Sequence, residues 1–189
     1  MNRQISFAQY RSIDLTILAV LMAVSQFVIF LASSFWYPEQ LYVVSPVAAM
    51  AALVMMRWGP WASIHAALGG VLYALMSGGT WQHFLIFGAG NLLSMLALIF
   101  VRIYTKERIR KDAVLTVVFA LMVQILMQLG RSAVAALLCF PADACLGFIT
   151  TDVLSCLFTA VIIWVVRRIE GLFEDQKHYL LRIQNEQKS

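Results

Sequence analysis

The sequence predicts an all-α integral membrane protein, a bundle of six transmembrane helices with both termini in the cytoplasm. Composition is the first observation, because 61% of the 189 residues are hydrophobic and only 13% are charged, against roughly 25% charged residues in a typical soluble domain. The second is the grouping of apolar residues into runs about 20 residues long, the length that crosses a bilayer. The third is the distribution of lysine and arginine between those runs.

Six apolar segments reach or approach the length of a membrane span and make residues 1–168 one transmembrane domain. Their expected bounds are 14–35, 42–57, 60–77, 82–103, 113–139 and 147–168. The second is short, and Arg57-Trp58-Gly59-Pro60 after it predicts a tight hairpin, because proline disfavours a helical residue before it and glycine frees the turn. Residues 169–189 alternate apolar and charged positions at helical spacing, which predicts an amphipathic helix on the inner membrane face or against a cytoplasmic partner.

Lysine and arginine set the expected orientation, because short cytoplasmic loops retain them. They precede the first segment, occur at Arg57, crowd residues 102–111 and follow the last segment, whereas 36–41, 78–81 and 140–146 contain none. Only an even number of spans with both ends inside satisfies this alternation. The tryptophans agree with it, since interfacial belts favour this residue at both membrane boundaries. We expect Trp36 and Trp81 at the outer boundary and Trp58, Trp61 and Trp164 at the inner one.

Several classes of function lack their usual signals. The net charge of +4 comes from basic residues dispersed between apolar runs, so no nucleic-acid partner is predicted. No phosphate-binding loop, His-Glu-x-x-His, Cys-x-x-Cys or Gly-x-Ser-x-Gly motif occurs, so we predict no cofactor, no metal site, no catalytic residue and no enzyme. Cys139 and Cys145 flank one short loop and either form a bridge outside the cell or, as we prefer, act as small apolar fillers.

Polar residues inside the spans predict a site. Arg131 lies about 12 Å from the outer end of the fifth segment, where an arginine costs about 2.5–3.5 kcal/mol and must face protein or a water-filled cavity. Gln124 and Gln128 precede it by seven and three residues, which places all three on one helical face. Asp152 in the sixth segment and Asn91 in the fourth also lie inside their segments, each within a few turns of the outer end. With His83, these residues outline a polar pocket that opens outward.

Two interpretations of the polar residues stay open and do not exclude each other. Arg131 and Asp152 form an ion pair that staples two helices, or they bind a ligand. A guanidinium suits a carboxylate or phosphate bound through two hydrogen bonds, which predicts an anionic or zwitterionic ligand. The aromatic residues of the first outer loop, Ser33–Gln40, are either a lid that stacks on the ligand, with Trp36 as the contact, or an ordinary aromatic belt.

Short motifs along the first three segments resemble the S components of energy-coupling factor (ECF) vitamin transporters. They are Ala19-Val-Leu-Met-Ala23, a small-xxx-small pair that lets helices approach closely in lipid, Pro46-Val-Ala-Ala-Met, Arg57-Trp58-Gly59-Pro60-Trp61 and Gly69-Gly70. The resemblance covers residues 14–168. It implies a subunit of a prokaryotic cell membrane that captures a small vitamin-like ligand near the outer face, among Trp36, Asn91, Gln128, Arg131 and Asp152.

The resemblance also implies partners. Ala19 and Ala23 would dock on a transmembrane coupling subunit that two cytoplasmic ATPases drive. The rival interpretation is an independent secondary transporter, with Asp152 or His83 as the site of proton or ion coupling. Many such carriers are built from internal repeats, and none is evident here.

Overall fold

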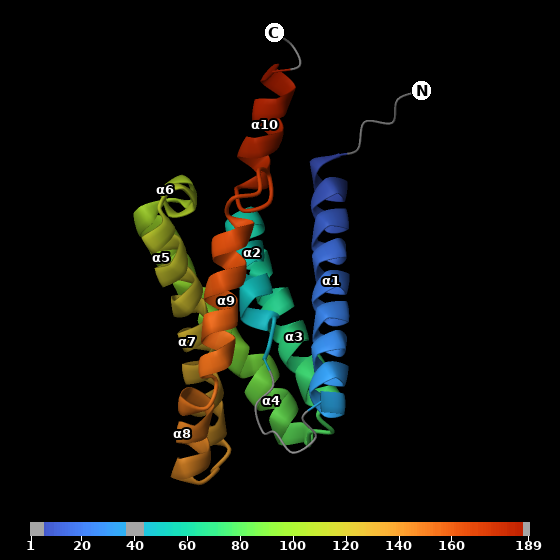
Figure 1. Cartoon of the computed structure of the whole chain (residues 1–189), viewed down its shortest axis with the longest axis vertical. Coiled ribbons are helices and arrows are strands. Elements are labelled where there is room, and N and C mark those ends of the chain that lie inside the picture. Colours follow the sequence, from blue (N-terminus) through green and yellow to red (C-terminus); the bar gives the residue numbers. More distant parts are fainter. Residues whose placement is uncertain (1–5, 37–43, 187–189) are drawn as a thin grey trace.

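The computed structural model describes residues 6–36 and 44–186, and all regular structure within them is helical. Five stretches are long and apolar enough to cross a membrane: Phe7–Trp36, Val47–Met76, Trp81–Tyr104, Ala113–Leu137 and Ala142–Val166. The chain is therefore an all-helical protein, consistent with a small multi-pass membrane protein. Helix α1 (Phe7–Trp36) lies along one side of the bundle (Figure 1), and only its residues Leu18, Met22 and Gln26 are buried.

The second of these stretches is a hairpin, not one straight helix. Helices α2 (Val47–Trp58) and α3 (Ala62–Met76) are joined by the 3₁₀ turn η1 (Gly59–Trp61), where Gly59 has φ +62°. A Cβ added to Gly69 would lie 2.6 Å from Val47 Cγ1, although the two residues would be about 33 Å apart in a straight helix. The chain thus reverses where the sequence predicts.

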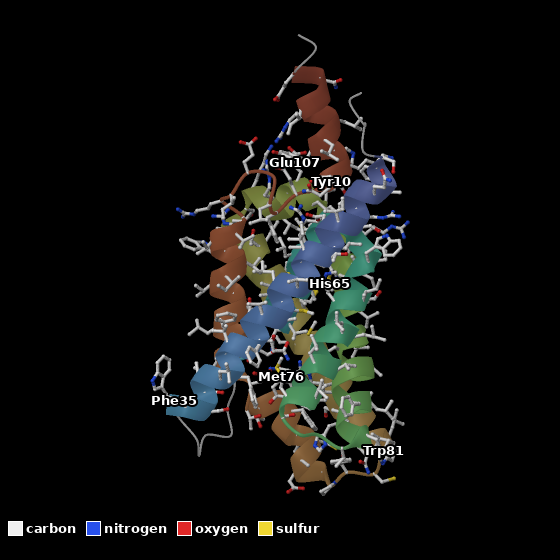
Figure 2. The ribbon with its side chains drawn as sticks, turned by 90° about the vertical axis from the view of Figure 1, so that its right-hand side faces the viewer. Tyr10, Phe35, His65, Met76, Trp81 and Glu107 are labelled. Carbon is white, nitrogen blue, oxygen red and sulfur yellow. The ribbon has the colours of Figure 1, made fainter. Side chains whose placement is uncertain are left out.

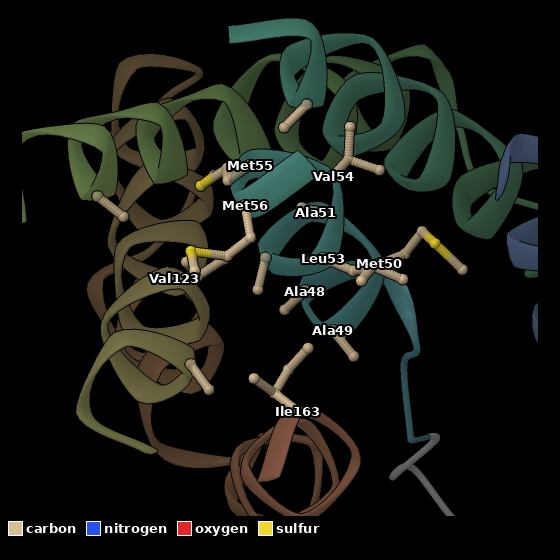
Figure 3. Close-up of a cluster of buried hydrophobic side chains, with 14 of the residues drawn as sticks. Ala48, Ala49, Met50, Ala51, Leu53, Val54, Met55, Met56, Val123 and Ile163 are labelled. Atoms are coloured by element: carbon tan, nitrogen blue, oxygen red, sulfur yellow. The ribbon is translucent and has the colours of Figure 1, made fainter. Parts of the chain in front are cut away.

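Helix α2 is the centre of the bundle. Each of its 12 residues is buried, and Figure 3 shows its side chains between those of α7 and α9, including Val123 and Ile163. It is only about 18 Å long, too short to cross a hydrocarbon core of about 30 Å. By length and composition, the described residues contain five candidate spans where the sequence predicts six, because the predicted spans 42–57 and 60–77 fall in the single stretch Val47–Met76.

The third and fourth candidate spans lie close to their predicted bounds. The third consists of α4 (Trp81–Gly90), the 3₁₀ segment η2 (Asn91–Leu96) and α5 (Ala97–Tyr104). The short helix α6 (Lys106–Lys111) follows, and then α7 (Ala113–Leu137). The side chain of Asp112 begins α7 by accepting hydrogen bonds from the N–H groups of Val114 and Leu115, which satisfies two otherwise unpaired donors.

The last candidate span differs from the prediction in two ways. It begins as α8 (Ala142–Thr150), so most of the predicted outer loop 140–146 is helical, and it breaks at Thr151 and Asp152 before α9 (Val153–Val166). Cys139 is exposed, Cys145 is buried, and both are free thiols. The alternative of a bridge between them is thus not realised, and Cys145 packs as a small apolar filler in a cluster around Ile86 and Ala135.

Of the predicted amphipathic helix 169–189, the structure describes residues 169–186, and within these the helix is α10 (Gln176–Glu186). Residues 167–175 fold as turns, in which Gly171 has φ +74° and Phe173 is fully buried. Phe173 belongs to the core because its ring lies 6.5 Å from that of Phe119 on α7. The hydroxyl of Tyr10 donates to Gln176 Oε1 at 3.1 Å, so α10 and the beginning of α1 lie at one end of the bundle, together with α6 (Figure 1). That end contains the basic segments that the sequence assigns to the cytoplasm.

Candidate functional site

Close helix crossings position the polar residues. Gly130 on α7 faces the carbonyl oxygen of Gly90 on α4 so closely that an added Cβ would collide with it. A Cβ on Gly90 would in turn lie 2.8 Å from the Arg131 Cα. Asn91 follows Gly90 and Arg131 follows Gly130, so the glycine crossing brings these two side chains together. Glycine is required at this crossing because no other residue permits such an approach between backbones.

Arg131 is buried but only partly bonded. Its Nε donates to Asn91 Oδ1 at 2.8 Å, and its Nη1 donates to Asp152 Oδ2 at 3.4 Å. The guanidinium carbon lies 5.1 Å from the centre of the Phe87 ring, within the range of a cation–π contact. The side chain is 8% exposed. Its Nη2 donates no hydrogen bond to any residue within the described ranges, 6–36 and 44–186.

The partners of Arg131 are fixed by bonds of their own. Asn91 is fully buried and donates through Nδ2 to the carbonyl oxygen of Ala66 at 2.9 Å. Gln124 Nε2 donates to Asp152 Oδ2 at 2.8 Å. Gln128 Nε2 lies 3.4 Å from the carbonyl oxygen of Asp152. The cluster therefore spans three elements, η2, α7 and the beginning of α9, and is held rigidly in place.

Asp152 sits at the break between α8 and α9. It is the residue before α9, with φ −100° and ψ 32°, yet its carboxylate does not cap that helix and turns instead toward α7. Oδ2 accepts from both Gln124 and Arg131, while Oδ1 accepts from none of the residues that the structure describes. The side chain is 18% exposed. Helices interrupted at mid-membrane are a feature of ligand and ion sites in transporters.

Five predicted site residues thus meet: Asn91, Gln124, Gln128, Arg131 and Asp152. His83 does not join them, because its Nδ1 caps the first turn of α4, accepting from the N–H of Thr80 at 3.1 Å. Its ring reaches the cluster only through Phe87, whose centroid is 6.4 Å away.

Trp36 is the last residue of α1 and is 71% exposed. Near it, Phe35 marks this end of α1 in Figure 2. The rest of the predicted lid, residues 37–40, lies outside the described part of the chain. Ala19 and Ala23 are half-buried on the flank of α1, between its packed face and its exposed face.

Arg57 is a second buried arginine, and the sequence did not predict that it would be bonded inside the protein. Asp14 on α1 binds it through both carboxylate oxygens, with Nε–Oδ2 at 2.9 Å and Nη2–Oδ1 at 2.6 Å. Trp58 Nε1 also donates to Asp14 Oδ2. The available signal was Asp14 itself, a carboxylate at the edge of the first apolar segment and at the same membrane level as Arg57.

Comparison with known proteins finds no matching family, no similar curated protein and no similar solved structure. The described residues also contain no group of three or more histidine, cysteine or acidic side chains placed to hold a metal ion.

Proposed function

We propose that this chain is the substrate-capture subunit of an ATP-driven importer of the ECF type, and that it binds a small anionic or zwitterionic, vitamin-like ligand at the polar cluster. The supporting observation is the incomplete bonding of the Arg131 guanidinium, whose Nη2 donates to none of the described residues and whose Nη1 lies 3.4 Å from Asp152 Oδ2. A buried ion pair without complete hydrogen bonding is a poor source of stability. A charge kept at this depth with a free donor is better explained by a ligand that completes its bonding.

The chemistry of the cluster defines the ligand class. Nη1 and Nη2 of Arg131 form the edge of a guanidinium that binds carboxylate or phosphate oxygens in pairs. Oδ1 of Asp152 is an acceptor suited to an amine or amide N–H of the same ligand. The first N–H groups of α9 lie beside it without a side-chain cap, and a helix N-terminus favours negative charge. Both charges of a zwitterion would thus find a partner.

The proposed role needs no catalysis and no cofactor in this chain. ATP hydrolysis would occur in two cytoplasmic partner subunits, and a transmembrane coupling subunit would bind α1 around Ala19 and Ala23. The peripheral position of α1 supports this assignment, because its exposed side offers apolar residues such as Ile17, Val20 and Val24 to lipid or to another helix. In a prokaryotic cell membrane, the end with α6 and α10 would face the cytoplasm.

The test is native mass spectrometry of protein purified gently from cells grown in rich medium. The wild type should retain a small molecule, and Arg131→Gln should lose it. The matched control is Arg108→Gln, which replaces an exposed arginine on α6 outside the cluster. A folded wild type without ligand in any preparation, or equal retention by Arg131→Gln, would refute the binding role.

A proton- or ion-coupled secondary transporter is the second candidate, favoured by the helix break at Asp152. The two candidates differ in energy source. Uptake by cells should stop on depletion of the partner ATPases in the first case and on addition of an uncoupler in the second. Ala19→Leu should abolish uptake but not ligand binding if α1 docks on a coupling subunit, and should change neither in an independent carrier.

A further inference from the structure

A groove of about 460 Å³ lies at the basic end of the bundle. Its walls are the first turn of α1, the turn between α2 and α3, the last turns of α5 and the beginning of α10. The groove is separate from the polar cluster, which lies deep among η2, α7 and α9. Its ionisable lining residues are Arg57, Arg102, Lys106, Asp175, Lys177 and His178.

Two of the cationic side chains in the groove have no ion-pair or hydrogen-bond partner among the described residues. Arg57 is neutralised by Asp14, and Lys106 Nζ lies 2.6 Å from Asp175 Oδ2. Asp175 is the one carboxylate in the lining, and its other oxygen lies 3.3 Å from His178 Nδ1. The side chains of Arg102 and Lys177 form no hydrogen bond or ion pair with the described residues. The groove therefore has an excess of two positive charges.

The apolar part of the groove lies at membrane level. Leu98 and Val101 of α5 form one wall, and their neighbours Ile99 and Ile103 are 58% and 67% exposed, as expected of a surface that contacts lipid. Trp61, one residue beyond the lining residue Pro60, is 41% exposed under the guanidinium of Arg11, which lies 4.5 Å from its ring. Tryptophan and arginine of this kind mark the headgroup region. The groove thus joins an apolar wall to a cationic rim at headgroup depth.

We propose that this groove binds one anionic phospholipid of the cytoplasmic leaflet, with its phosphate between Arg102 and Lys177 and its glycerol and first methylene groups along Leu98 and Val101. Basic pockets between membrane helices on the cytoplasmic side select anionic headgroups. Phosphate is complementary to the two unpaired cations, and Asp175 does not repel it because Lys106 and His178 hold that carboxylate. The proposal does not depend on the transport function.

The test compares phosphatidylglycerol with phosphatidylcholine of the same acyl chains, titrated into the detergent-solubilised full-length protein and counted by native mass spectrometry. The wild type should retain one phosphatidylglycerol in preference to phosphatidylcholine. The double substitution Arg102→Gln and Lys177→Gln should weaken that binding about 25-fold, since each basic residue near an anionic headgroup contributes about fivefold. Arg108→Gln and Arg168→Gln together, which remove two basic residues outside the groove, should leave it unchanged.

Each other outcome would overturn the proposal. Equal retention of both lipids by the wild type would show that the groove does not select charge. An equal loss in the control pair would show a diffuse effect of net charge. Displacement of the lipid by millimolar glycerol 1-phosphate would assign the groove to a soluble phosphate ligand. The same spectra show whether the double variant still retains the ligand at Arg131. That second reading distinguishes failure of the phospholipid proposal from failure of the proposed ligand-binding function.

Discussion

Arg57 and Arg131 are both buried arginines beside an aspartate, but they are bonded in opposite ways. Arg57 uses three nitrogens in four hydrogen bonds, two to Asp14 and two from Nη1 to the carbonyl oxygens of Gly171 and Leu172 at 2.7 and 3.0 Å. Arg131 uses two nitrogens in two bonds, and its contact with Asp152 is 3.4 Å long. Burial is similar, at 6% and 8% exposure of the side chains.

The difference separates a structural role from a binding role. The bonding at Arg57 is nearly complete, because four of the five guanidinium N–H donors are used, and it joins α1, α2 and the segment before α10. At Arg131 the rigid environment of Asn91 and Gln124 holds the guanidinium in place without satisfying it. A preorganised but incomplete site is what a ligand can complete without reorganisation of the protein.

The largest expected effect is on the more fully bonded site, that of Arg57. Arg57→Gln removes the ion-pair partner of Asp14, whose side chain is only 16% exposed and keeps, among the described residues, just the bond from Trp58. This loss should lower the stability by about 3–5 kcal/mol. Thermal unfolding in detergent, followed by tryptophan fluorescence, measures the loss. Adding Asp14→Asn should restore part of it, since the uncompensated charge is then removed. No recovery in the double variant would mean that the bonds to residues 171 and 172 dominate this site.

Arg131→Gln should reverse the pattern. We expect a smaller loss of stability, about 1–3 kcal/mol, because Asp152 keeps its bond from Gln124. The binding free energy of the ligand should weaken by about 2–5 kcal/mol. It is measured by titrating the ligand that co-purifies with the wild type into Arg131→Gln and into Arg57→Gln. A loss of stability equal to that of Arg57→Gln, together with unchanged affinity, would make Arg131 a second staple.

The sequence predicts the polar cluster well because depth and spacing are local properties. Helical periodicity places Gln124, Gln128 and Arg131 on one face, and the cost of a charge in lipid requires a partner such as Asp152. What it does not predict depends on tertiary packing. The break at Thr151 and Asp152 contains no proline or glycine that would predict it. It coincides with the hydrogen bonds that the Asp152 carboxylate accepts from Gln124 and Arg131 on α7.

The burial of α2 and the turn around Phe173 are similarly invisible in the sequence. An apolar run such as 47–58 has the same composition whether it faces lipid or protein, so its length suggested a span and its central position could not be foreseen. Phe173 fits a helical stripe, but Gly171 allows a left-handed turn that redirects it into the core. Ion pairs between distant segments, such as Asp14 with Arg57, require the fold itself.

Gly130→Ala tests whether the crossing with α4 positions Arg131. The added methyl would meet the carbonyl oxygen of Gly90, so we expect a loss of about 1–3 kcal/mol from overpacking and weaker ligand binding. The matched control is Gly147→Ala on α8, where a Cβ meets nothing within 4 Å. It should stabilise the protein by about 0.5–1 kcal/mol. Equal effects of the two substitutions would show that the crossing has no special role.

The smallest expected effect concerns the segment that supplies carbonyl oxygens to Arg57. Burial raises the pKa of Asp175, but the hydrogen bond and charge of Lys106 outweigh it, so that the pKa lies below the ordinary value of 3.8. A carboxylate with a depressed pKa in the folded state contributes stability above its unfolded pKa and loses it as the pH falls through the folded value. The contribution of this partly exposed pair should be under about 1 kcal/mol.

Asp175→Asn should therefore lower the unfolding temperature slightly at pH 6, and the difference from the wild type should shrink as the pH falls below 3.8. Lys111→Gln, which removes an exposed ion pair with Glu107 on α6, controls for general loss of surface charge. If Asp175→Asn unfolds like the wild type at pH 6, the ion pair does not hold residues 171–176 in place. The bonds from Arg57 and the buried ring of Phe173 would then hold that segment in place without the ion pair. The Arg57 site would not depend on the surface charges around it.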